Sequence, residues 1–288
     1  MGIRVINVQV PKQGADNEVF FIADERGNEY VIKVGNSAMN DVSALNLIQE
    51  IQLGIPVPKF YGHFTFEDKT VLILEKINFP LLESTSVDTQ HLYINSMVEN
   101  LNKIHSIKSE KAGLPAENGR TMSWQELLLF RYSGKHLWLD WNSIIHREGV
   151  ETRLIQTSIE RITSEIEHQE LIQSSYSFLH TDFNQRNLFV DPVTKKLAGI
   201  IDWTESMFGD PLYDFARVRM YIWHFNLKHH ALETLYKLIE ITEEEKKLME
   251  LYFVNLIIEY IAWYSEAKSD SNNARLRLHQ QFLRDYKW

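Results

Sequence analysis

The stretch His180–Asp214 reads HTDFNQRNLFVDPVTKKLAGIIDWTESMFGDPLYD, and it decides the fold. It begins with the spacing H-x-D-x-x-x-x-N, which is the spacing of a kinase catalytic loop. In such a loop the Asp, here Asp182, accepts a proton from the hydroxyl group that is phosphorylated, and the Asn, here Asn187, holds a metal ion. The spacing therefore predicts phosphoryl transfer to the hydroxyl group of a small molecule, with Asp182 as the base.

A second carboxylate follows the loop. Asp202 comes directly after the apolar run 197–201 (LAGII). A hydrophobic strand that ends in a carboxylate holds an oxygen ligand for Mg²⁺ at a fixed distance from the loop, so Asn187 and Asp202 are the expected metal ligands. The competing interpretation is structural: Asp182 and Asn187 make Asx turns, His180 lies in the core, and Asp202 caps the next helix.

The composition is that of a soluble globular protein. The chain has 288 residues, of which 44% are apolar and 12% aromatic, enough for a large core. The apolar segment 251–264 is interrupted by Asn255 and Glu259 and is too short to cross a bilayer. Residues 1–11 lack the basic start, apolar centre and cleavage site of a signal peptide. We therefore expect a cytoplasmic monomer that does not contact membranes.

Cysteine content and charge exclude further classes of function. The chain contains no cysteine, which excludes disulfides, thiolate catalysis and Cys-ligated zinc and leaves metals with oxygen ligands. Thirty basic and 39 acidic residues give a formal net charge of −9. This balance argues against nucleic acid as a partner and is compatible with a cationic ligand.

Residues 1–77 show a strand-like, turn-rich pattern with one helical segment. The pattern predicts a small antiparallel sheet and one helix, which ends at the Gly- and Pro-containing stretch 54–58. The expected strands lie near 3–10 and at 18–23, 29–34, 59–66 and 70–75, and the expected helix at 41–53.

From residue 88 onward the pattern is mainly helical. The expected helices are 88–107, 123–130, 151–172, 211–226, 230–239 and 242–267, with a short β region at 189–201. The sequence thus predicts an α+β, bilobal protein-kinase-like fold. Residues 1–77 would form the nucleotide-binding lobe and hinge, and residues 78–288 the catalytic and substrate-binding lobe.

Lys33 is the candidate phosphate ligand of the first lobe. It lies within the otherwise apolar run 30–34 (YVIKV), where an ammonium group is costly to bury unless an anion meets it. This is the context of the kinase lysine on the third strand, which pairs with a helix carboxylate. Asp41 and Glu50 are the candidates, and we prefer Asp41 because it lies one turn before Leu45 on the side that faces the sheet. The alternative is an edge-facing lysine.

Two segments complete the predicted nucleotide site. The loop 11–18 (PKQGADNE) contains Gly14 and could close over phosphates with its backbone N–H groups. It matches neither a kinase Gly-rich loop nor a Walker A motif, so an ordinary hairpin loop is the competing interpretation. Glu75 and Ile77 lie in the segment that joins the lobes, where main-chain groups would receive the edge of a purine base.

These residues together resemble the aminoglycoside phosphotransferases, a family whose fold is similar to that of protein kinases. The resemblance covers nearly the whole chain. Within the family the chain looks most similar to hygromycin B phosphotransferases, and this finer resemblance rests on segment 203–210 and on a weaker match at 121–124. Thr181 departs from the small residue often found at its position. The matching residues are 30–34 (YVIKV), 55–58 (IPVP), 179–183 (LHTDF) with Asn187, and 201–210 (IDWTESMFGD).

The resemblance implies Mg²⁺-assisted transfer of the γ-phosphoryl group of ATP or GTP to a hydroxyl group of an aminoglycoside or aminocyclitol antibiotic, which confers resistance. It also implies Asp182 as the base, Asn187 and Asp202 as metal ligands, and Lys33 as the phosphate contact. The alternatives are a kinase of another metabolite or a macrolide on the same scaffold, and a nucleotide-binding pseudoenzyme. A protein kinase is disfavoured because the chain lacks a Gly-rich loop and an Ala-Pro-Glu segment.

Acidic residues of the second lobe are candidate contacts for a cationic acceptor. We single out Glu205 and Glu259, although Glu259 lies on a helix that is otherwise apolar and aromatic. Asp210 is expected to cap the next helix, and Asp214 to be structural in the same turn. Three tryptophans could stack on sugar rings, but large aromatic residues more often lie in the core: Trp138, Trp141 and Trp203.

Overall fold

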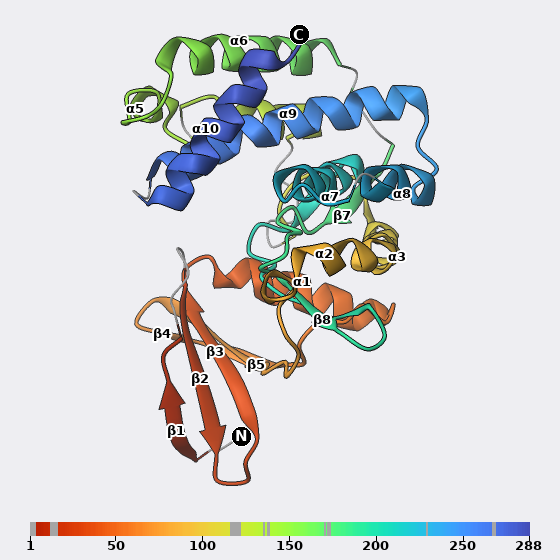
Figure 1. Cartoon of the computed structure of the whole chain (residues 1–288). Helices are drawn as coiled ribbons and strands as arrows, with labels where there is room; N and C mark the ends of the chain where they lie inside the picture. Colours follow the sequence, from red (N-terminus) through yellow and green to blue (C-terminus); the bar gives the residue numbers. More distant parts are fainter. Residues whose placement is uncertain are drawn as a thin grey trace.

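A five-stranded antiparallel sheet forms the N-terminal part of the computed structural model (Figure 1). Its strands lie in the order β1-β2-β3-β5-β4. The strands are β1 (Val5–Gln9), β2 (Glu18–Asp24), β3 (Glu29–Gly35), β4 (Phe60–Phe66) and β5 (Lys69–Glu75). The structure describes residues 4–11, 17–115, 122–134, 136, 139–169, 171, 174–228, 230–266 and 269–288.

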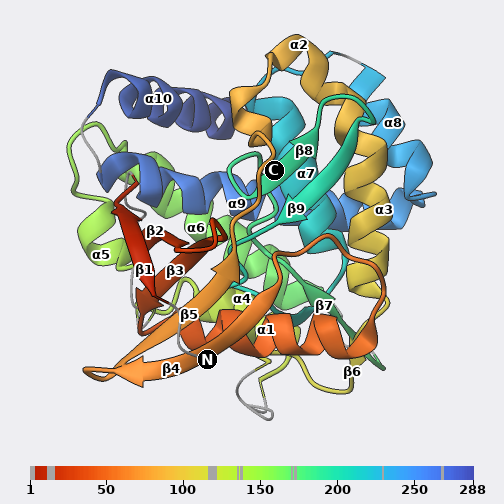
Figure 2. The same cartoon turned by 90° about the horizontal axis from the view of Figure 1, so that it is seen from below.

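One helix, α1 (Ala38–Ile51), packs on this sheet. Figure 2 shows it beside β4 and β5, and Figure 1 shows it between the sheet and the helical part of the chain. Its buried residues Val42, Leu45 and Ile48 recur every three to four positions and contribute to a core that includes Leu72 of β5. The helix begins three residues before the predicted start at residue 41.

The remainder of the chain is mainly helical, as predicted. Two small antiparallel sheets lie within it, β10-β7-β6 and β8-β9. The helices are α2 (Val87–Gln90), α3 (Ile94–His105), α4 (Trp124–Phe130), α5 (Trp141–Ile144), α6 (Thr152–His168), α7 (Leu212–His224), α8 (His230–Leu238), α9 (Glu243–Glu266) and α10 (Asp270–Asp285), with 3-10 turns at Leu82–Ser84 and His91–Tyr93. The short strands are β6 (Lys108–Ser109), β7 (Tyr176–Leu179), β8 (Leu188–Asp191), β9 (Lys196–Ile200) and β10 (Met207–Gly209).

Helix α9 is the centre of the helical core. It contacts α5, α6, α7 and α10, and residues Tyr252–Glu259 are all buried. Trp141 and Trp203 are 6% and 1% exposed, so both indole rings belong to the core rather than to a sugar-binding surface. Trp138 lies outside the described residues. No helix in the described part of the chain is both long and apolar enough to cross a membrane.

Several elements differ from the sequence-based expectation, and the short helix α5 and the strands β6, β7 and β10 were not predicted. The helix predicted at 88–107 is divided into α2, a 3-10 turn and α3, and the helix predicted at 151–172 ends at His168. The pattern did not predict α10 at all. This helix is strongly polar, and only Leu276, Leu283 and two polar residues on it are buried, so its apolar stripe is too sparse to be recognised.

Two buried histidines connect α7 to α10. The rings of His224 and His279 lie 5.4 Å apart between centroids. Burial lowers the pKa of His224 to about 3 and that of His279 to about 4. Both imidazoles are therefore neutral in the folded protein at neutral pH.

This pair predicts loss of stability in acid. The unfolded state takes up protons near pH 6.5, whereas the folded state does so only below about pH 4. The free energy of unfolding should therefore decrease as the pH falls below about 6.5, by roughly 1.4 kcal/mol per pH unit for each histidine. Urea denaturation between about pH 7.5 and 4.5 measures this slope. His279→Asn, whose amide can donate to the Arg275 carbonyl as Nδ1 does, should reduce the slope; an unchanged slope would contradict the assignment.

Candidate active site

An ion cluster that is buried at Lys33 and Asp41 and open to solvent at Asp202 joins β3, α1 and the segment after β9. The Lys33 Nζ atom donates to Asp41 Oδ2 at 2.6 Å, to Asp202 Oδ1 at 2.8 Å and to Thr204 Oγ1 at 2.8 Å. Burial alone would lower the pKa of Lys33, but the two carboxylates outweigh burial and raise it, so the ammonium group is charged. The structure thus places Asp41 beside Lys33, as predicted, and Glu50 is exposed on the same helix.

Asp41 also fixes the backbone that follows Asp202. Its Oδ1 atom accepts a hydrogen bond from Trp203 N at 2.7 Å, and its Oδ2 atom accepts one from Thr204 Oγ1 at 2.8 Å. Asn40, its neighbour on α1, donates to the carbonyl groups of Thr204 and Ser206 at 2.6 and 2.9 Å. The start of α1 therefore binds the segment 202–206, which is distant in sequence.

Asp202 faces the cluster from a left-handed backbone conformation, with φ of 65°. Burial raises its pKa, but the opposite charge and hydrogen bond of Lys33 and the Thr204 hydroxyl outweigh burial and lower it, so the carboxylate is ionised. Its side chain is 46% exposed, and Lys33 and Thr204 both bind Oδ1. Oδ2 is the atom that can face a metal ion.

The predicted catalytic loop orients Asp182 with two amide groups. Asn187 Nδ2 donates to Asp182 Oδ2 at 2.8 Å, and Asn184 Nδ2 donates to Asp182 Oδ1 at 2.9 Å. Because Asn187 uses its amino group here, its amide oxygen can serve as a ligand. The Asn187 carbonyl accepts from Ile201 N at 3.0 Å, so the loop and the residue before Asp202 are directly joined.

Asn187 and Asp202 fit a magnesium site by the chemistry of their donors. Both supply oxygen, which Mg²⁺ prefers, and Mg²⁺ in nucleotide enzymes takes one or two protein ligands, with phosphates and waters in the other positions. In the described residues no group of three or more His, Asp or Glu side chains is arranged to hold a metal. A site of this kind depends on the nucleotide to complete the coordination.

Asp214 holds the start of the catalytic loop from α7. Thr181 has φ of 60°, which is strained for a β-branched residue. The fully buried Asp214 carboxylate accepts from His180 N at 2.9 Å, Thr181 N at 2.8 Å and His105 Nε2 at 3.0 Å. Burial alone would raise the pKa of Asp214. The hydrogen bonds that the carboxylate accepts outweigh burial and lower the pKa below its ordinary value, so the carboxylate is charged. The expectation of a structural role is confirmed.

His180 is a core residue and not a catalytic group. It is 0% exposed, and its Nε2 atom lies 3.0 Å from the Ile201 carbonyl oxygen. Its ring contacts Trp203 at 4.5 Å between centroids. The histidine of the motif therefore connects the loop to the strand that leads to Asp202.

Arg217 lies beside Asp182 and was not predicted. Its Nη1 atom is 3.7 Å from Asp182 Oδ1, and it projects from α7 one turn after Asp214. The sequence did hold a signal, since positions three apart on a helix share a face. Without the fold, nothing indicated that this face contacts the catalytic loop.

The other predicted site residues are placed as follows. Glu75 accepts from Lys59 N through Oε2 at 3.1 Å, so its side chain belongs to the sheet edge. Ile77 contacts β9 so closely that a Cβ atom at Gly199 would lie 2.3 Å from its Cδ1 atom, which explains the glycine. Gly14 lies outside the described residues. The Glu205 carbonyl oxygen accepts from Thr181 Oγ1 at 2.7 Å, which places Glu205 beside the catalytic loop.

Glu259 is placed differently from the expectation. It is 6% exposed and forms a two-point ion pair with Arg131, with distances of 2.6 Å from Nε to Oε1 and 2.9 Å from Nη2 to Oε2. Asn255 also donates to Oε1 at 2.7 Å. Both oxygens are therefore occupied inside the helical core, and we do not retain Glu259 as an acceptor contact.

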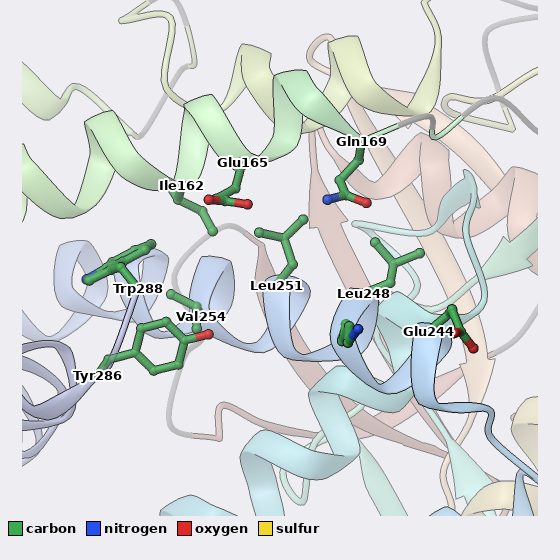
Figure 3. Close-up of a pocket in the computed structure, with 10 residues that line it drawn as sticks. Ile162, Glu165, Gln169, Glu244, Leu248, Leu251, Val254, Tyr286 and Trp288 are labelled. Carbon is green, nitrogen blue, oxygen red and sulfur yellow. The ribbon is translucent and has the colours of Figure 1, made fainter.

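A cavity of about 400 Å³ lies apart from these groups (Figure 3). It is bounded by α6, α9 and the C-terminal residues, among them Glu165, Leu251 and Trp288. None of the predicted site residues lines it. The chemistry of the catalytic loop therefore does not take place in this cavity.

The comparisons with known proteins agree with this geometry. The model of the APH phosphotransferase enzyme family matches residues 7–246. The chain belongs to this family. It is therefore a kinase-like phosphotransferase, as the sequence resemblance predicted. No curated protein matches the chain.

Solved structures show the same fold. A thermostable mutant of aminoglycoside phosphotransferase APH(4)-Ia, in ternary complex with ADP and hygromycin B, has 17% identity and a TM-score of 0.72 over 97% of this chain and 92% of that chain. Amicoumacin kinase hAmiN with AMP-PNP, Ca²⁺ and Ami has 12% identity and a TM-score of 0.71 over 98% and 90%. The GDP and kanamycin complex of APH(2")-IIia has 11% identity and a TM-score of 0.67 over 98% and 93%. At these identities the likeness establishes the fold alone.

The role of Asp214 predicts a large cost for its replacement. Asp214→Asn substitutes an amino group for one of two oxygens that accept from buried donors, and it removes the buried charge. We expect the free energy of unfolding to decrease by about 3 kcal/mol. Asp191→Asn, at the end of β8, is the matched control and should cost less than about 1 kcal/mol. Equal stability of the two variants in urea denaturation would refute the bracing role.

Proposed function

We propose that this enzyme transfers the γ-phosphoryl group of ATP or GTP to a hydroxyl group of an aminoglycoside or aminocyclitol of the hygromycin type. The observation that carries the proposal is the Asp182 carboxylate, oriented by Asn187 and joined through it to Asp202 and Lys33. The family match supports phosphoryl transfer, and the fold shared with APH(4)-Ia supports the acceptor class.

In the proposed reaction Asp182 accepts the proton of the acceptor hydroxyl group. At the same time the oxygen of that hydroxyl group forms a bond to the γ-phosphorus. The bond from the γ-phosphorus to the bridging oxygen breaks, and the nucleoside diphosphate leaves. Asn187 and Asp202 would hold Mg²⁺, which would supply positive charge to the phosphate oxygens. Such a reaction needs mainly positioning and charge neutralisation, so a carboxylate of ordinary basicity is sufficient.

Lys33 has two functions in this proposal. Without nucleotide it neutralises Asp41 and Asp202 across the two parts of the molecule. With nucleotide it contacts the phosphates, while Asp41 retains it in place. Residues 1–77, with Gly14 in the first loop and the main chain at Glu75 and Ile77, would form the nucleotide-binding lobe.

A kinase of a different small molecule is the second candidate. The Arg217 guanidinium, 3.7 Å from Asp182 Oδ1, places positive charge beside the base. Such charge disfavours an acceptor with an ammonium group directly beside the reacting hydroxyl group. In addition, the same fold occurs in amicoumacin kinase hAmiN. A pseudoenzyme is disfavoured because Lys33 and Asp182 are both present with their partners.

We further infer that the enzyme acts in the cytoplasm as a monomer, without nucleic-acid or membrane partners, and that it confers resistance to its acceptor. The acidic balance of the chain, with a net charge of −9, supports the absence of nucleic-acid partners. Resistance follows if the acceptor is an antibiotic whose binding requires the free hydroxyl group.

Replacing the base tests the reaction. Asp182→Asn keeps the shape of the side chain and removes its basicity. Release of ADP or GDP in the presence of hygromycin B, other aminoglycosides, a macrolide and simple amino alcohols should fall by at least about 100-fold in this variant. Nucleotide affinity should stay within about threefold of the wild-type value, since the base contacts the acceptor. A fully active variant would exclude Asp182 as the base.

The metal role of Asp202 is tested by binding. Asp202→Ala removes a proposed oxygen ligand, so the gain in nucleotide affinity on adding Mg²⁺ should decrease by about tenfold or more. Calorimetric titration with and without Mg²⁺ measures this gain. Glu50→Ala is the control: it removes an exposed carboxylate of the same helix, α1, that lies outside the cluster, so the Mg²⁺-dependent gain should persist. The same gain in Asp202→Ala as in the wild type would contradict the assignment.

A further inference from the structure

Arg217 is the buried cation nearest to the candidate base in the described part of the chain. We propose that Arg217 is a positioning residue that fixes the orientation of the Asp182 carboxylate toward the acceptor hydroxyl. This inference rests on the proposed role of Asp182 as the base. It assigns Arg217 a part in the reaction that neither the catalytic-loop spacing nor the family match indicates.

The guanidinium group of Arg217 is also held by two tyrosines. Its Nη1 atom donates to the Tyr260 hydroxyl at 3.2 Å, and its Cζ atom lies 5.5 Å from the Tyr260 ring centroid and 5.7 Å from that of Tyr213. The side chain is only 10% exposed. Two aromatic faces and a hydroxyl group therefore determine where its charge lies.

Among the described residues, no ion pair of Arg217 other than that with Asp182 explains why this charge is buried. A buried cation is costly unless an anion or several acceptors meet it. Arg131 has Glu259, and Arg219, two positions along α7, has Glu250. The carboxylate paired with Arg217 in the described structure is Asp182, and its Nε atom is buried without a hydrogen-bond partner there.

Arg217 Nη1 lies 3.7 Å from Asp182 Oδ1, so it can orient the carboxylate by its charge without donating a hydrogen bond to it. A hydrogen bond between these groups would be shorter than about 3.2 Å and would use a lone pair of Oδ1. At the observed distance Arg217 attracts Oδ1 by charge and leaves that oxygen able to accept from a substrate hydroxyl. Asn187 and Asn184 fix the rotation of the group, and Arg217 provides a positive charge 3.7 Å from Oδ1.

The test compares two neighbouring arginines. Arg217→Met removes the charge and keeps most of the side-chain volume, and Arg217→Lys keeps the charge without the planar guanidinium. Arg219→Met is the matched control, because Arg219 is equally buried on the same helix and pairs with Glu250 away from the loop. The readouts are kcat and KM for nucleotide and acceptor, together with nucleotide hydrolysis without acceptor.

We expect kcat of Arg217→Met to fall about 100-fold, as for a misplaced reacting group, while both KM values change less than about threefold. Arg217→Lys should retain more activity than Arg217→Met, and Arg219→Met should stay within about threefold of the wild-type kcat. Equal kcat values for the two Met variants, corrected for the folded fraction, would overturn the proposal.

A cycle of variants separates this inference from the proposed function. If the wild-type protein phosphorylates none of the acceptors, the proposed function fails. Whether Arg217 and Asp182 interact is then tested by measuring the unfolding equilibrium constants of Asp182→Asn, Arg217→Met and the double variant. Coupling of about fivefold or more in the unfolding equilibrium constant supports an electrostatic hold on Asp182, and additive effects overturn it.

Discussion

The structure depends on one buried lysine that lies between two parts of the chain. Lys33 of the N-terminal sheet binds Asp41 of α1 and also Asp202 after β9, 169 positions away in sequence. A buried ion pair is stable only when its partners are complete, so α1, the sheet and the segment 202–206 must assemble together. The groups proposed to contact phosphate and metal are thereby arranged before a nucleotide binds, which reduces the cost of organising them during the reaction.

The catalytic loop is held by the same means, from the helical side. Thr181 has a strained backbone, and Asp214 stabilises it by accepting from two consecutive backbone N–H groups. Arg217, one turn later on α7, reaches the carboxylate of the following loop residue, Asp182. One face of one helix thus holds the backbone just before the candidate base and places the proposed positioning residue beside its carboxylate, and the core around α9 holds that helix.

The sequence predicted those features that local pattern or spacing encodes. Lys33, Asp182, Asn187 and Asp202 were proposed as site residues because each has a characteristic immediate context, and helical phase favoured Asp41 over Glu50. Features that depend on distant pairing were missed. Glu259 was assigned to the acceptor because its partner Arg131 is 128 positions away, and Arg217 and Thr204 gained meaning only from the fold. Helix α10 was missed because most of its surface is polar.

The most direct test of the account follows the phosphorus atom itself. Phosphorus-31 NMR of the purified enzyme with Mg²⁺, ATP or GTP, and hygromycin B or another aminoglycoside distinguishes a phosphate monoester from free phosphate. The account predicts that a monoester signal grows at the rate at which the γ-phosphate signal disappears. It also predicts that the monoester phosphorus couples to protons on a single carbon of the acceptor, the carbon that carries the phosphorylated hydroxyl group. Appearance of inorganic phosphate alone, or an unchanged γ-phosphate signal with every acceptor, would contradict it.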